Sequence, residues 1–354
     1  MSLLKSTIKQ IVPQDSASRT KAKARLEQLT MPHWALGRLM DLAEDLAGMT
    51  RSMHPPVARK TVAVMAADHG VTAEGVSKYL QEVTAQMIYN FVKGGAGINA
   101  LARLAGGRVV VVDMGVAGDL SALAGEGKIL SKRMGAGTDN IARGPAMSRD
   151  DAVRCIEMGI EVARDLGPDT DLFATGDMGI GNSTASAAVI AAVTGRPADE
   201  VVGRGAGLDD DQLANKIKVV ERCLEVNQPN PADGVDLLAK IGGFEIGGIS
   251  GLVLGAAAVQ KPVLVDGFAS TAGALIAQCL SIQVTDYIIS AHRSAEQGHG
   301  AALEHLGKQP LLDLNLRLGE GTGAALAMNL VEAAVRILTE VATFEEASVS
   351  RANQ

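Results

Sequence analysis

The sequence contains few aromatic residues and few cysteines. Aromatic side chains make up 3 % of its 354 residues, so the interior must be built mainly from Ala, Val, Leu and Ile. The three cysteines, Cys155, Cys223 and Cys279, are far apart, and no two of them have CxxC spacing. This pattern argues against a disulfide framework or a cysteine-rich zinc site. We therefore expect reduced, mostly buried thiols.

Long apolar runs and an excess of basic residues are also missing. No uninterrupted apolar run of about 20 residues occurs, and no charged-then-apolar leader opens the chain. We expect a soluble, cytoplasmic protein with no membrane segment. The formal net charge of −7 disfavours a nucleic-acid partner, because phosphate-backbone binding needs a concentrated basic face. A small anionic ligand remains compatible with this charge.

Several motifs of common enzyme classes are absent. A GxGxxG dinucleotide fingerprint, a GxSxG elbow and a HExxH pair do not occur, which disfavours a nicotinamide-dependent oxidoreductase, serine acyl transfer and zinc hydrolysis. His292, His299 and His305 do not share one helical face. The acidic run 209–211 is explained more simply by the start of a helix than by metal binding. We expect no metal and no cofactor.

Glycine and small apolar residues are abundant, with 40 glycines in the chain. Short apolar runs that each end in a polar loop alternate with helical stretches such as 150–165 and 269–281. This alternation predicts an α/β fold, a Rossmann-like parallel sheet covered by helices on both faces. Ligands of such sheets bind at the carboxyl ends of the strands. The predicted strands are 61–67, 108–112, 171–174, 262–265 and 287–289.

The length of the chain predicts a second unit, because single cores stop growing at about 250–300 residues. Apolar residues recur at helical spacing between 20 and 50, with a break at Pro32, and again between 324 and 338. We predict that residues 1–58 and 318–354 form a small helical domain. The α/β domain would then comprise residues 59–317.

Glu320 is the first candidate for catalysis. It is the only proton-accepting side chain in the segment 317–327, where it lies between Gly319 and Gly321. Glycines allow a tight turn and close approach of a ligand, so Glu320 is placed as a general base would be. The alternative is a plain helix start, with Thr322 as the N-cap.

Two glycine-rich loops are candidates for binding an anion. Residues 176–184 follow a predicted strand and open an Ala-rich helix, so backbone N–H groups and the Asn182 side chain can face a phosphate. The loop 203–207 precedes a helix that carries Lys216, which can add a positive charge. A plain strand-to-helix turn and a solvated surface lysine are the alternatives. Ser294 can bind an anion or cap a helix.

Six separated segments together resemble one family, the nicotinate-nucleotide:dimethylbenzimidazole phosphoribosyltransferases. The resemblance runs in order from about residue 25 to residue 340. It rests on the segments ADHG (67–70), GDMGIGN (176–182), NQPN (227–230), GGFE (242–245), DGF (266–268) and RLGEG (317–321).

The resemblance implies a function, a partner and roles for individual residues. It implies transfer of phosphoribose from nicotinate mononucleotide to a lower-ligand base of a cobamide, by a dimer. Glu320 would deprotonate the acceptor with Asp177 in support. The resemblance also implies that Gly179, Gly205, Lys216 and Ser294 hold the donor phosphate and that Met178 and Leu318 help form the acceptor pocket. Ile180 and Asn182 in the glycine-rich loop, and Tyr79 and Met87 in the acceptor region, are further candidates for substrate binding.

The sequence also departs from the family pattern. Asp177 stands where members commonly have Glu, and Leu80 stands where many have Pro. Tyr79 and Met87 fall where some relatives make polar contacts to the benzimidazole, and Met offers no useful hydrogen bond to an azole nitrogen. The acceptor can therefore be another base or a phenol. A non-catalytic paralogue that stabilises a heterodimer is a further alternative.

Overall fold

The computed structural model describes residues 2–350, and its centre is a six-stranded parallel sheet with the order β3-β2-β1-β4-β5-β6. This confirms the predicted α/β fold and every predicted strand. Sequence patterns did not indicate the short β3 or a separate parallel pair, β7 (His292–Ser294) and β8 (Leu312–Leu316). The strands of the large sheet are β1 (Lys60–Ala67), β2 (Arg108–Gly115), β3 (Leu130–Ser131), β4 (Leu172–Met178), β5 (Val263–Val265) and β6 (Ile288–Ser290).

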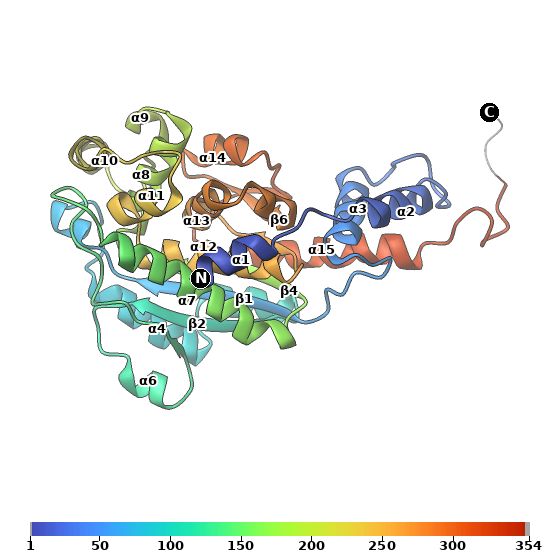
Figure 1. The fold of residues 1–354 in the computed structure, drawn as a ribbon, viewed down its shortest axis with the longest axis horizontal. Helices are drawn as coiled ribbons and strands as arrows, with labels where there is room; N and C mark the ends of the chain where they lie inside the picture. Colours follow the sequence, from blue (N-terminus) through green and yellow to red (C-terminus); the bar gives the residue numbers. More distant parts are fainter. Residues whose placement is uncertain (1, 351–354) are drawn as a thin grey trace.

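Helices cover both faces of this sheet (Figure 1). One face contacts α4 (Glu82–Lys93), α5 (Gly97–Leu104) and α15 (Thr322–Glu340), and the other contacts α12 (Phe244–Ala258). Further helices pack around α12 or lie at the sheet ends. They are α6 (Ser121–Gly125), α7 (Arg149–Leu166), α8 (Asn182–Thr194), α9 (Ala198–Val201), α10 (Asp210–Asn227), α11 (Gly234–Ile241), α13 (Phe268–Leu280) and α14 (His299–Leu306).

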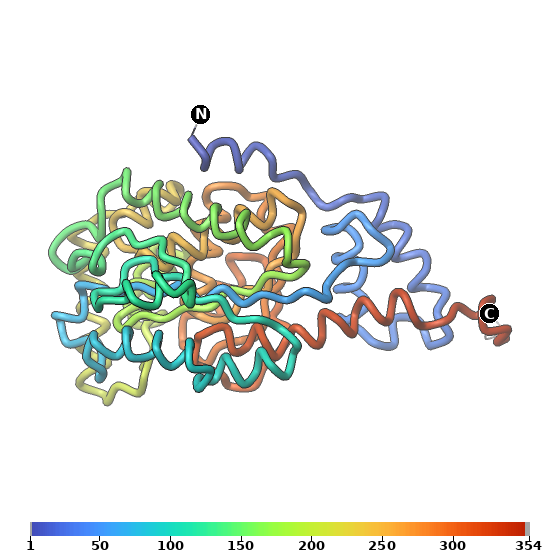
Figure 2. Tube along the Cα trace, turned by 90° about the horizontal axis from the view of Figure 1, so that it is seen from below, coloured from blue at the N-terminus to red at the C-terminus, as the bar shows by residue number. Residues whose placement is uncertain are grey.

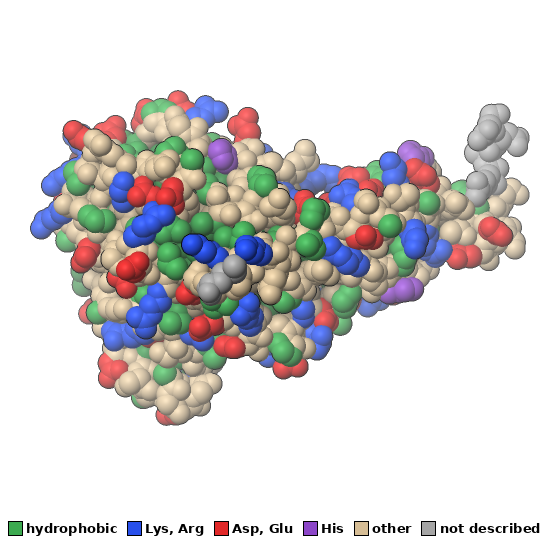
Figure 3. Space-filling view, in the orientation of Figure 1, with side chains coloured by type: hydrophobic (Ala, Val, Ile, Leu, Met, Phe, Trp, Pro, Cys, Tyr) green, Lys and Arg blue, Asp and Glu red, His purple; other side chains and the backbone are tan. Residues whose placement is uncertain are grey.

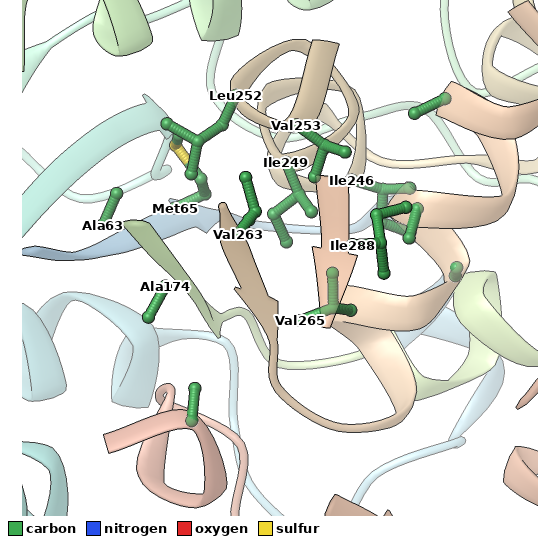
Figure 4. Packing of buried hydrophobic residues seen from close by; sticks show 14 of the residues in the cluster. Ala63, Met65, Ala174, Ile246, Ile249, Leu252, Val253, Val263, Val265 and Ile288 are labelled. Carbon is green, nitrogen blue, oxygen red and sulfur yellow. The ribbon is translucent and has the colours of Figure 1, made fainter. Parts of the chain in front are cut away.

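The central helix α12 is buried along almost its whole length, because it lies between the sheet and a second layer formed by α7 and α13. Figure 4 shows its side chains Ile246, Ile249, Leu252 and Val253 beside strand residues of the core. Glycine allows α7 to approach closely, since a Cβ on Gly251 would lie 1.9 Å from the carbonyl oxygen of Ile156. The small residues that are abundant in the sequence thus serve helix packing.

Segments from both ends of the chain form an arm beside this body (Figures 1 and 2). Helices α2 (Ser16–Leu26) and α3 (Arg38–Thr50) pack against each other and against α15. Leu29 and Thr343 form an isolated antiparallel β-bridge, which joins the two ends of the chain. Helix α1 (Leu3–Gln10) instead lies on α7 and α12 of the body. The division into domains at 58/59 and 317/318 stays a prediction.

The surface carries charges of both signs, which are interspersed over the face shown in Figure 3.

Within residues 2–350, one helix, α15, is long and apolar enough to cross a membrane by length and composition, and 56 % of that stretch is buried inside the protein. It packs against α3, α5 and the sheet, as a core helix does.

The cysteines are free, with Cys155 and Cys223 buried as predicted and Cys279 half-buried.

Candidate functional site

A cavity of about 560 Å³ lies at the carboxyl ends of the strands. It adjoins the boundary between β1 and β4, from which β2 and β3 extend the sheet on one side and β5 and β6 extend it on the other. Doubly wound sheets bind ligands at such a boundary. Every residue predicted for the site lines this cavity, so the fold brings them together, while their chemical roles stay predictions. They are Tyr79, Met87, Asp177, Met178, Gly179, Ile180, Asn182, Gly205, Lys216, Ser294, Leu318 and Glu320.

Glu320 lies in a strained turn between β8 and α15. Its φ is 62°, a left-handed conformation that is uncommon for a residue with a side chain, and Gly319 and Gly321 also have positive φ. The turn presses onto β4, since a Cβ on Gly176 would lie 2.5 Å from the Glu320 carbonyl oxygen. Backbone strain of this kind concentrates at functional sites.

The Glu320 carboxylate is buried at the cavity wall. Its Oε2 accepts a hydrogen bond of 3.1 Å from the backbone N–H of Ile98, in the first turn of α5. Burial raises the pKa of Glu320, and the Ile98 N–H partly opposes that rise. A raised pKa lies closer to the operating pH, and a general base is most effective when its pKa is near that pH.

The start of α15 differs from the sequence interpretation, because Thr322 is the first helical residue and not the N-cap. Its hydroxyl donates to the carbonyl of Gly319 at 2.8 Å. Asp266, which follows β5, takes the capping role by accepting from the N–H groups of Gly321 at 3.2 Å and Ala324 at 2.8 Å. Local sequence patterns could not predict this contact, because Asp266 and Gly321 are 55 positions apart.

Asp177, the last residue but one of β4, lies beside this turn. Its Oδ2 accepts from Asn182 Nδ2 at 2.9 Å, and a Cβ on Gly319 would lie 3.0 Å from the same oxygen. Burial, with the charges of Asp266 and Glu245 adding to it, raises the pKa of Asp177 to about 8. This rise favours the protonated form of Asp177, which can donate a hydrogen bond, whereas an ionised carboxylate only accepts.

A buried ion pair supports the glycine turn that follows β4, and no sequence pattern indicated this pairing. His69 Nε2 lies 2.7 Å from Glu245 Oε1, with both side chains inaccessible to solvent. Burial lowers the pKa of His69, but the Glu245 carboxylate raises it further, so the net shift is upward. A Cβ on Gly181 would lie 3.2 Å from the Cβ of His69. The pair thus packs directly beneath this turn.

Lys216 is buried, with only 1 % of its surface exposed, so the alternative of a solvated surface lysine is wrong. Its Nζ donates to Ser183 Oγ at 2.9 Å and lies 3.4 Å from the Gly203 carbonyl oxygen. Across residues 2–350, no carboxylate oxygen comes within 4.0 Å of it. Burial lowers the pKa of Lys216 to about 8, against an opposing effect of Glu296. A buried ammonium group of this kind favours an anionic ligand.

Ser294 and Ile180 also form hydrogen bonds within the fold. Ser294 belongs to β7, where its Oγ accepts from the Glu296 N–H at 3.3 Å, so the alternative of a helix cap is wrong. The Ile180 N–H donates to Thr84 Oγ1 at 3.1 Å. Asp209 caps α10, which confirms the interpretation of the acidic run as a helix start.

Within residues 2–350, the structure contains no group of three or more His, Cys, Asp and Glu side chains that could hold a metal ion. Ser183, a donor of the predicted anion loop, lines the cavity, and so do residues to which the sequence analysis had assigned no role, among them Glu296 and Arg317. Arg317 donates to the Gly205 carbonyl oxygen at 2.9 Å. Only the fold reveals Glu296 and Arg317, because each lies in a loop that follows a different strand, β7 or β8.

Four aromatic or apolar side chains of the lining form what we call the apolar side of the cavity. Tyr79, Met87, Met178 and Leu318 line it, and Tyr79 and Leu318 are 53 % and 61 % exposed. The site therefore has a polar side around Lys216 and an apolar side open to solvent, with Glu320 among the residues that line it.

Comparisons with known proteins agree with this geometry. Residues 11–349 match the model of a family described as phosphoribosyltransferase. The chain belongs to the phosphoribosyltransferase family. This phosphoribosyltransferase is 59 % identical over 351 residues to the nicotinate-nucleotide–dimethylbenzimidazole phosphoribosyltransferase of Syntrophotalea carbinolica, with 99 % of each chain covered. It is 52 % identical to the protein of the same name from Geobacter sulfurreducens, again with 99 % of each covered.

A solved structure of that name also matches. The crystal structure of the protein from Thermus thermophilus superposes on this phosphoribosyltransferase with a TM-score of 0.89 at 44 % identity, covering 96 % of this chain and all of that one. The chain is thus an enzyme that transfers a pentosyl group, and its fold is that of the family. None of the comparisons favours a phenol-specific enzyme or a non-catalytic paralogue.

Proposed function

We propose that this enzyme transfers phosphoribose from nicotinate mononucleotide to 5,6-dimethylbenzimidazole or a related base. The products are an α-ribotide phosphate, for assembly of the nucleotide loop of a cobamide, and nicotinate. One observation carries the proposal: a buried lysine without a carboxylate partner lies in the same cavity as a buried glutamate. The names of close relatives support the choice of substrates.

The donor phosphate lies against Lys216, Ser294 and the loops at Gly179 and Gly205. Lys216 supplies a positive charge, and the loops and Ser294 supply hydrogen-bond donors. A protonated Lys216 is needed for this role, and the charged form is present below its pKa of about 8. Phosphate binding at this end holds the ribose in the cavity, so the anomeric carbon is positioned for attack.

The acceptor base lies against the apolar side, with its ring N–H towards Glu320. A ring nitrogen forms the new bond to the anomeric carbon as the bond to the pyridinium nitrogen breaks, and the electron pair of that bond stays on nicotinate. The acceptor proton passes to Glu320. Attack on the face opposite the leaving group inverts the β-nucleotide to the α-product. The protonated Asp177 donates a hydrogen bond and does not take the proton.

The direct test supplies nicotinate mononucleotide together with a panel of benzimidazoles, purines and phenols. Nicotinate release and the mass of the ribotide product are then measured for each acceptor. We expect release with benzimidazoles and a product heavier than the acceptor by one phosphoribosyl group. If nicotinate fails to appear with every acceptor, the proposed function is wrong.

We also propose that the enzyme is a cytoplasmic homodimer with the helical arm as its small domain. Light scattering on the purified chain measures its mass in solution. A monomer, or activity only after a paralogue is added, would contradict the homodimer.

A further inference from the structure

Glu296 is a cavity-lining carboxylate that the mechanism above does not use. It lies in the turn between β7 and α14 and is 9 % exposed. Its N–H donates to Ser294 Oγ at 3.3 Å, and its carbonyl accepts from the His299 N–H at 3.0 Å. The backbone therefore fixes the side chain at the polar side of the cavity.

The carboxylate of Glu296 packs against the glycine loop that also contacts Lys216. Oε2 accepts from the Gly205 N–H at 3.4 Å, and a Cβ on Gly203 would lie only 2.1 Å from Oε2, so glycine leaves room for the acid. In the part of the chain that is described, Oε1 accepts no hydrogen bond and is not among the polar atoms sealed from solvent. One oxygen of Glu296 is thus available to a ligand.

Lys216 and Glu296 flank one loop, and the Glu296 charge raises the pKa of Lys216, but each group forms its hydrogen bonds with other partners. Lys216 bonds to Ser183 and approaches the carbonyl of Gly203, while Glu296 accepts from Gly205. A phosphate can use the lysine but not the carboxylate, because a phosphate dianion and a carboxylate both only accept hydrogen bonds. On a phosphoribosyl group, the hydrogen-bond donors are the two ribose hydroxyls.

We propose that Glu296 binds a ribose hydroxyl of the donor nucleotide and makes the enzyme selective for ribonucleotides over deoxyribonucleotides. This assignment rests on the proposed function, since it takes nicotinate mononucleotide as the donor. Hydrogen bonds to a sugar 2-hydroxyl strengthen as an oxocarbenium-like transition state forms, and a carboxylate is a strong acceptor for such a bond. The contact therefore contributes to turnover as well as to binding.

The test combines a substitution in the protein with a deletion in the substrate. Wild type, Glu296→Gln and Glu296→Asp are assayed with nicotinate mononucleotide and with its 2′-deoxy and 3′-deoxy analogues. We expect Glu296→Gln to reduce kcat/KM for the ribonucleotide roughly tenfold or more, as for the loss of one hydrogen bond to a charged group. With the analogue that lacks the bound hydroxyl, the same substitution has almost no effect. The aspartate variant shows a smaller loss with the same pattern.

A matched control removes the same charge from the surface. Glu304→Gln alters an exposed carboxylate on α14, and its rates should equal those of wild type. Melting temperatures identify any variant that is merely unfolded, and the aspartate variant then carries the comparison.

Two results would overturn the proposal. An equal loss with all three donors excludes a hydroxyl contact. Tighter binding of nicotinate mononucleotide and of inorganic phosphate to Glu296→Gln means that the acid competes with phosphate for the Gly205 N–H. Absence of nicotinate release by the wild type refutes the proposed function itself, which is a separate outcome.

Discussion

The polar and apolar sides of the cavity are built in different ways. The polar side consists of backbone N–H groups, the buried Lys216 and the Glu296 carboxylate, and glycine loops hold these groups in place. The apolar side consists of four side chains, and two of them, Tyr79 and Leu318, are more than half exposed. Buried groups and glycine loops form the polar side, whereas partly exposed side chains form the apolar side.

This difference predicts which half of the reaction is specific. A phosphate and a ribose present charges and hydrogen bonds, so an error on the polar side leaves buried groups unpaired at a high cost. An apolar wall discriminates weakly, because one methylene in such a pocket changes binding by about 1–3 kcal/mol. We therefore expect strict donor selection and a broader choice of acceptors.

The largest expected effect is at Glu320, which serves the chemical step itself. Glu320→Gln keeps the shape of the side chain but cannot take the acceptor proton, so kcat should fall roughly 10²–10⁴-fold, the usual contribution of a general base. The KM of the donor should change little. Stopped assays of nicotinate release measure both constants.

The matched control for this variant is Glu340→Gln, which alters an exposed carboxylate at the other end of α15. Undiminished turnover of Glu320→Gln would contradict the assignment of the base. A donor KM that rises as much as kcat falls would place Glu320 on the donor side instead.

The next effect is at Lys216 on the polar side. Lys216→Met removes an ammonium group that is buried and has no carboxylate partner, so the protein should melt no lower than wild type. The donor KM should rise roughly 10–100-fold, because a hydrogen bond to a charged group is lost. Titration calorimetry with inorganic phosphate should show the same loss. An unchanged donor KM would remove Lys216 from the phosphate site.

The charge of Lys216 also predicts a pH dependence. Because its pKa is lowered to about 8, the charged form is present below that pH and is lost as the pH rises through it. The kcat/KM for the donor should therefore fall above pH 8, since this constant reports groups of the free enzyme. In Lys216→Arg the charge persists, and the fall should move to higher pH. An alkaline limb that stays in place in this variant would assign it to another group.

Part of the polar side could be predicted from the sequence. Glycine loops before helices and the apolar strand runs are local patterns, so the sheet, the loops at Gly179 and Gly205, and the position of Glu320 followed from neighbours in the chain. The burial of Lys216 did not follow, because helix position alone does not show which side chains the fold encloses. The short strand β3 carries too few residues for a pattern.

Contacts between distant segments were the other failure. Asp266 directly follows the predicted strand 262–265, but its capping of α15 joins residues 55 positions apart. His69 and Glu245 pair across 176 positions. Glu296 carried no signal, because a single acid in a loop is ordinary in a sequence. The roles of such residues can be inferred only from the folded structure, which shows the carboxylate in contact with a glycine loop or a buried histidine.

The smallest expected effect is on the apolar side, where Tyr79→Ala tests whether the acceptor wall is permissive. Because Tyr79 is 53 % exposed, it contributes only part of its surface to a bound base, so the acceptor KM should rise by no more than about tenfold. The donor KM should stay the same. Met87→Leu, which conserves volume, is the matched control and should leave the order of preferred acceptors unchanged. If Tyr79→Ala changes the donor KM more than the acceptor KM, the division of the cavity into two sides is wrong, because a residue on the apolar side would then be part of the phosphoribose site.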